Sequence, residues 1–82
     1  MYMKNRTEQR TRQFAQLGLT VAFYRKLKGI TQAELAEAVN LSRTHISNLE
    51  APHMPTSISL EKLFDISEML DVPIQNLFDF RD

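Results

Sequence analysis

The chain has 82 residues, enough for one domain, and its hydrophobic content of 43% argues against intrinsic disorder. The absence of cysteine excludes disulfides and thiolate metal sites, and no apolar run approaches the ~20 residues of a membrane-spanning helix. The N-terminus lacks the apolar segment of a signal peptide, and we therefore expect a cytoplasmic protein. Frequent alanine, leucine, glutamate, lysine and glutamine favour an all-α fold.

The formal net charge is zero, yet the charges are unevenly distributed along the chain. Residues 1–30 carry a net charge of +6, residues 31–50 carry −2, and residues 51–82 carry −4. This asymmetry predicts one basic and one acidic side. The basic side suits a nucleic-acid partner, although charge alone also allows a basic tail and an acidic solvated helix without any partner.

Residues 1–12 are polar and basic, and we interpret them as either a flexible arm or a helical extension of a domain formed by residues 13–82. From Phe14 onward, apolar residues recur at spacings of three and four, as on one face of a helix. The members of this stripe are Phe14, Leu17, Val21, Tyr24 and Leu27. The helix is expected to end near Gly29, because glycine readily adopts the left-handed conformation of a C-cap.

Three later helix starts share one signature, a capping hydroxyl flanked by apolar residues. Thr31 is the first of these N-caps, and Glu34 three residues later completes a capping box. Ser42 and Ser59 take the same place before the next two helices, and each such cap contributes about 1 kcal/mol. The helix from Leu60 has a predicted buried face of Leu63, Ile66, Ser67 and Leu70. It is expected to end at Asp71, and Pro73 suits the first turn of a short fifth helix.

The segment from 31 to 50 predicts two short helices joined by a connection too short for an antiparallel pair. The two helices must therefore cross steeply, as in a helix-turn-helix. Ala36 lies where the helices approach most closely, and a larger side chain would push them apart. Asn40 falls at the turn, where a positive φ is needed and asparagine tolerates it well.

The second of these helices has a polar face opposite Ile46 and Leu49, which we expect to be buried. The side chains on that polar face are Arg43, Thr44, Ser47 and Asn48. Arginine can bond guanine O6 and N7 together, asparagine can pair with adenine, and the threonine methyl can contact thymine. An isolated helix with this face would as readily be an ordinary solvated helix, but its place in a helix-turn-helix favours base contacts in double-stranded DNA.

The segment from Val21 to Phe78, roughly 70% of the chain, resembles the lambda-repressor-like helix-turn-helix domain of phage repressors, Cro and XRE-type regulators. The resemblance is carried by Gly29-Ile30-Thr31-Gln32, Glu34-Leu35-Ala36, Ile46-Ser47-Asn48-Leu49-Glu50 and the later residues Leu63, Ile66, Ser67, Leu70, Val72, Leu77 and Phe78. It implies a compact five-helix fold with the helix-turn-helix in helices two and three. It also implies a transcriptional regulator, a repressor that binds a short palindromic operator as a homodimer.

The resemblance further implies roles for individual residues. Gln32 is similar to a family glutamine that bonds a DNA phosphate and supports the first recognition residue, here Arg43. Ser42 would bond a phosphate while it caps its helix. Arg25 and Glu50 match a partly buried, structural ion pair between the first and third helices.

Some positions depart from the family pattern or stay open. The loop from 51 to 57 contains no lysine or arginine, and its two prolines cannot donate an N–H, so we do not expect it to supply phosphate contacts. The N-terminal arm, with Arg6, Arg10 and Arg12, would substitute for the loop, with Arg12 as our candidate phosphate contact; a solvated tail is an equal alternative. His45 beside the polar face is either another phosphate contact or a solvated residue.

Other functional classes find less support. His53 has no partner at metal-ligand spacing, and the chain has neither a Gly-rich phosphate loop nor a Ser/His/Asp arrangement. We therefore predict no catalytic residue, metal or cofactor, and no enzyme. RNA binding is disfavoured because no surface aromatics are placed to stack on bases. An antitoxin-like protein-interaction module with secondary DNA binding remains the alternative function.

Phe80 either packs on the core or, as we favour, forms a dimer contact together with Ile74 and Phe78.

Overall fold

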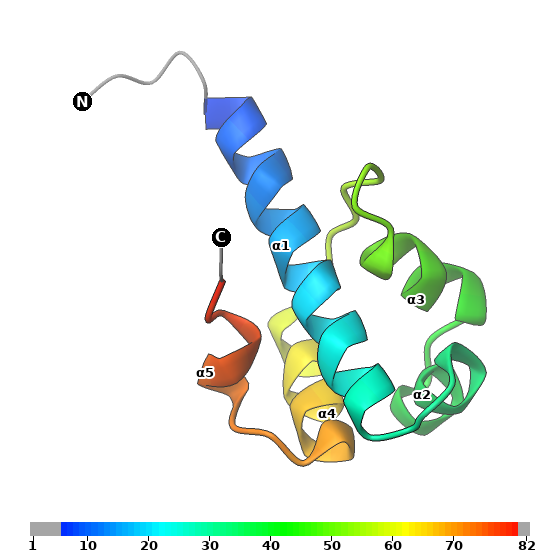
Figure 1. Ribbon diagram of the computed structural model, residues 1–82. Helices are drawn as coiled ribbons and strands as arrows, with labels where there is room; N and C mark the ends of the chain where they lie inside the picture. The colour runs from blue at the N-terminus through cyan, green and yellow to red at the C-terminus, as the bar shows by residue number, and fades with distance from the viewer. Residues whose placement is uncertain (1–5, 81–82) are drawn as a thin grey trace.

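A computed structural model describes residues 6–80 and shows a bundle of five helices (Figure 1). The helices are α1 (Arg6–Leu27), α2 (Gln32–Val39), α3 (Arg43–Glu50), α4 (Leu60–Leu70) and α5 (Ile74–Leu77). α1 runs through the middle of the view, between α5 on one side and α2 and α3 on the other. The compact all-α fold with five helices is the one predicted from the sequence. Within the described residues, no helix is long and apolar enough to cross a membrane.

α1 is longer than its apolar stripe indicated, because it begins at Arg6. The described part of the basic segment, from 6 to 12, therefore forms the first turns of α1. Leu17 and Val21 are buried as expected, but the prediction for Leu27 is wrong, since 65% of its surface is exposed. Leu27 lies six residues after Val21, about 240° around the helix, and so faces away from the core.

The core draws on all five helices. Its completely buried side chains are Val21, Leu35, Ile46, Leu49, Ile66, Leu70 and Leu77. Ala36 is also buried, as expected for a residue between the two helices of the helix-turn-helix. Among the polar residues, Ser67 lies in the buried face of α4 as predicted.

α1, α2 and α4 end in the same way, with one residue in the left-handed conformation. These residues are Gly29, Asn40 and Asp71, with φ angles of 73°, 58° and 56°. The next residue then donates its backbone N–H to a carbonyl five residues earlier, in the bonds Ile30 to Arg25, Leu41 to Ala36 and Val72 to Ser67, at 2.9–3.0 Å. Because the donors Ile30, Leu41 and Val72 also pack against the core, each turn directs the next segment onto the bundle.

The helix starts follow the predicted caps. The Thr31 hydroxyl accepts from Glu34 N at 3.0 Å, and Thr31 N donates to the Glu34 carboxylate at 2.9 Å. The backbone N–H of Thr31 thereby holds the pKa of Glu34 below its ordinary value. Ser42 and Ser59 cap α3 and α4 in the predicted manner. Pro73 occupies the N-cap of α5, one residue before the helix.

The C-terminal segment packs on the bundle. Ile74 and Phe80 are partly buried against the core, in agreement with the core-packing interpretation of Phe80, and the dimer contact that we favoured stays a prediction. Phe78 is 47% exposed. Of the three apolar side chains considered for a dimer contact, Phe78 is thus the one that faces outward.

Candidate nucleic-acid interface

α3 presents its polar residues on one outward face. Arg43, Thr44 and Ser47 are exposed and Asn48 is partly exposed, and their positions along the helix place all four on the same side. Ile46 and Leu49 on the opposite side are buried in the core. The structure therefore brings the four predicted base-contacting residues together and supports them from behind.

The first turn of α3 is fixed by Ser42. Its hydroxyl oxygen accepts a hydrogen bond from His45 N at 2.9 Å, which leaves the hydroxyl hydrogen to donate outward. Ser42 itself is exposed at the same end of α3 as Arg43. The predicted phosphate contact and the N-cap role are thus compatible in this one side chain.

The last turn of α3 lies against the backbone of α1 at Gly18. A Cβ atom built on Gly18 would lie 1.7 Å from the Leu49 carbonyl oxygen and 2.8 Å from its carbonyl carbon. No side chain fits this space, so glycine sets the distance between α1 and α3. We did not predict a role for Gly18 from the sequence, although a glycine inside an otherwise amphipathic helix often marks a close approach.

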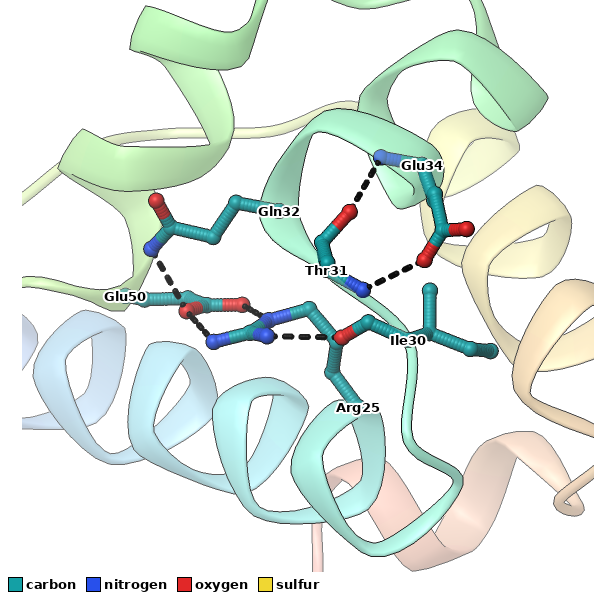
Figure 2. A network of polar contacts seen from close by, with 6 residues as sticks. All are labelled: Arg25, Ile30, Thr31, Gln32, Glu34 and Glu50. Carbon is teal, nitrogen blue, oxygen red and sulfur yellow. Dashed lines mark hydrogen bonds and ion pairs between the residues drawn. The ribbon is translucent and has the colours of Figure 1, made fainter.

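Next to Gly18, a buried ion pair joins α1 to the end of α3 (Figure 2). Arg25 Nε donates to Glu50 Oε2 at 2.7 Å, and Arg25 Nη2 donates to Glu50 Oε1 at 2.9 Å. Arg25 Nη1 also donates to the Ile30 carbonyl at 2.7 Å, just before α2. The hydrogen bonds to Glu50 raise the pKa of Arg25 above its ordinary value. This pair holds α1, α3 and the start of α2 in one arrangement.

Gln32, the first residue of α2, completes the network. Its Nε2 donates to Glu50 Oε1 at 2.9 Å (Figure 2). A carboxylate only accepts, so the amide nitrogen must face Glu50. We expected Gln32 to support Arg43, but no hydrogen bond joins these two residues in the part of the chain that the structure describes. Glu50 and Arg43 lie at opposite ends of α3, about 10 Å apart.

The remaining candidates lie outside the polar face of α3. His45 is partly buried, and its Nε2 lies 3.3 Å from the Ser57 carbonyl oxygen in the loop before α4. Arg12 is exposed on α1, and His53 is exposed in the loop. Residues 6–80 contain no group of three or more histidine, aspartate or glutamate side chains that could hold a metal ion.

The sequence pattern of the helix-turn-helix family matches residues 21–77, more than half of the chain. The chain belongs to this lambda-repressor-like, XRE-type helix-turn-helix family. The matched region contains α2 and α3 and begins inside α1, so the first turns of α1 precede it. Helix-turn-helix domains bind DNA by placing their second helix in the major groove. In this chain the second helix of the helix-turn-helix is α3.

Two curated transcriptional regulators and one solved structure resemble the chain. The chain is 33% identical over 63 residues to the HTH-type transcriptional regulator SinR of Bacillus subtilis and 32% identical over 66 residues to SinR of Bacillus licheniformis. These alignments cover 77% and 80% of this chain but 56% and 59% of the relatives, so the chain spans little more than half of their length. The crystal structure of the restriction-modification controller protein C.AhdI from Aeromonas hydrophila matches with a TM-score of 0.72 and 25% identity, over 79% of this chain and 96% of that one.

Proposed function

We propose that this helix-turn-helix protein is a sequence-specific transcriptional regulator that reads double-stranded DNA with α3. The observation that carries the proposal is the exposed polar face of α3, held from behind by buried Ile46 and Leu49 and at its end by the Arg25–Glu50 pair. A helix fixed in this way presents its side chains without a large ordering cost on binding. The names of both SinR relatives, which are transcriptional regulators, agree with this function.

The four side chains on the face have complementary chemistry for base edges. Arg43 can donate two hydrogen bonds to guanine, and Asn48 can pair with adenine in the major groove. Thr44 and Ser47 add hydroxyl groups, and the Thr44 methyl can contact thymine. A good bidentate contact of this kind is worth about 1–3 kcal/mol of discrimination between bases.

The candidates for contacts with the neighbouring phosphates lie at the starts of α2 and α3. Ser42 donates from its hydroxyl at the start of α3, and Gln32 donates the amide N–H that Glu50 does not use. His45 is the third candidate, on the side of α3 that faces the loop. Such contacts fix the register of the protein on the duplex but carry no sequence information.

We further propose that the protein is a repressor that binds a short palindrome as a homodimer and blocks it by occupancy. Exposed apolar side chains are available for a second copy, and they are Leu19, Phe23 and Leu27 on α1 and Phe78 after α5. Leu19, Phe23 and Leu27 follow one another at intervals of four and so form a ridge along the outer side of α1. Apolar ridges of this kind are typical of protein–protein contacts.

Selection of bound sequences from a random DNA pool tests the function. Recovery of one motif as an inverted repeat is the expected result, with the half-sites about one helical turn apart. Recovery of a single half-site would contradict the homodimer, and recovery of no motif would contradict sequence-specific recognition. Light scattering of the wild type and of Phe23→Glu then tests whether the apolar ridge joins two copies, since only the variant should be monomeric. A second, different protein that co-purifies in place of a second copy would favour the antitoxin-like alternative.

A further inference from the structure

The first turns of α1 and the loop before α4 enclose a groove on one side of the bundle. Figure 1 shows the loop beside the N-terminal half of α1. The groove has a volume of about 450 Å³ and is lined by Thr7, Arg10, Thr11, Phe14, Pro55 and Ser57. The N-terminal residues of this set precede the region matched by the family pattern, so family membership assigns them no role.

The lining of the groove suits an anion. Its lining includes three residues with hydroxyl groups, Thr7, Thr11 and Ser57, and the basic residue Arg10, beside the apolar Phe14 and Pro55. No aspartate or glutamate of the described residues lines it. Arg10 Nε donates to the Gln13 side chain at 2.9 Å, which holds the guanidinium while its terminal nitrogens remain to donate elsewhere. A phosphate accepts both kinds of donor, and a guanidinium can bind it with two parallel hydrogen bonds.

The groove also lies next to the helix that reads DNA. Ser57, on the loop side, has its carbonyl 3.3 Å from His45 Nε2 on α3, and His45 directly follows Thr44 of the reading face. On α1, Arg10 and Phe14 continue the helix face that Gly18 turns toward α3. Arg12 lies two residues after Arg10, about 200° around the helix, and does not line the groove.

We propose that this groove binds a phosphate of the DNA backbone beside the bases read by α3, with Arg10 as the charged ligand. The loop itself contains no lysine or arginine, and α1 supplies the cation from its N-terminal extension. The proposal rests on the proposed DNA-binding function and assigns to Arg10 the role that the sequence analysis gave to Arg12. The hydroxyl groups of Thr11 and Ser57 contribute uncharged hydrogen bonds to the same phosphate.

The test compares Arg10→Gln with its matched control Arg12→Gln, since each removes one charge from an exposed position of α1. Binding to a selected duplex and to a random duplex is measured at several salt concentrations. For each phosphate neutralised, log K falls against log[salt] with a slope of about −0.9. Arg10→Gln should lower the magnitude of this slope by about one and weaken binding to both duplexes alike, while Arg12→Gln leaves the slope unchanged.

Two results would overturn the groove assignment: an unchanged slope for Arg10→Gln, or an equal change in slope for both variants. A third variant, Thr11→Val with Ser57→Ala, keeps the charge and should weaken binding without changing the slope. If this double variant bound DNA as tightly as the wild type, the hydroxyl groups of Thr11 and Ser57 would not contact the phosphate. Failure of the proposed function looks different, because the wild-type protein would then bind selected and random duplexes equally.

Discussion

Gly18→Ala is expected to separate α1 from α3. The added Cβ would lie 1.7 Å from the Leu49 carbonyl oxygen, whereas ordinary contacts begin at 3.4 Å. The obstacle is backbone and not a flexible side chain, so one helix must move by about 2 Å. Overpacking of this kind costs about 3 kcal/mol, of which about 1 kcal/mol is offset by the better helix propensity of alanine. The net loss of about 2 kcal/mol lowers Tm by roughly 8–16 °C in a domain of this size.

Thermal unfolding followed by circular dichroism measures this effect, and DNA affinity reports the displacement of α3. Gly29→Ala is the matched control, since nothing lies within 4 Å of its Cβ and only its φ of +73° is unfavourable. It should cost about 1 kcal/mol and leave the DNA affinity of the folded protein unchanged. Wild-type Tm and affinity for Gly18→Ala would refute the close approach of α1 and α3.

Three further substitutions test the network and the helix ends. Glu50→Ala leaves the buried Arg25 without its charged partner and should cost about 3–5 kcal/mol in chemical unfolding. The double variant Arg25→Met, Glu50→Leu should lose less, and an equal loss would argue against a buried pair. Asn40→Val should destabilise by about 1–2 kcal/mol because valine resists positive φ, and Asn40→Gly should unfold like the wild type; equal stability of all three would contradict the left-handed turn. Glu34→Gln removes a carboxylate whose folded pKa is lowered, so its stability deficit should be present at neutral pH and vanish as pH falls through that lowered pKa. A deficit in the melting curves that persists in acid would exclude the capping carboxylate as its source.

The starts of α2, α3 and α4 and the ends of α1 and α2 could be predicted because local chemistry determines them. Each N-cap hydroxyl, of Thr31, Ser42 and Ser59, accepts a hydrogen bond from a residue only three positions later. The positive φ angles of Gly29 and Asn40 follow from the ability of glycine and asparagine to adopt the left-handed conformation. The polar face of α3 also follows from helical periodicity once its buried residues are recognised.

The parts that the sequence analysis missed depend on contacts between distant segments. From the sequence alone, Gly18 is only a residue of low helix propensity, and its role follows from the position of α3 against it in the fold. The sequence alone does not indicate which acceptor the Gln32 amide binds, because Glu50 lies 18 residues away and reaches the amide only in the folded chain. The sequence of the basic N-terminal segment is compatible with an arm as well as with a helix. Only the helical conformation of α1 determines that Arg10, and not Arg12, lies beside the loop.

The central claim, that the outward side chains of α3 read bases, is tested most directly by measuring wild-type and Arg43→Ala affinities for every single-base variant of the selected site. We expect Arg43→Ala to lose discrimination at one base pair in each half-site, by about 1–3 kcal/mol, and to keep it elsewhere. An Arg43→Ala profile identical to that of the wild type, or one weakened equally at all positions, would contradict base reading by this helix.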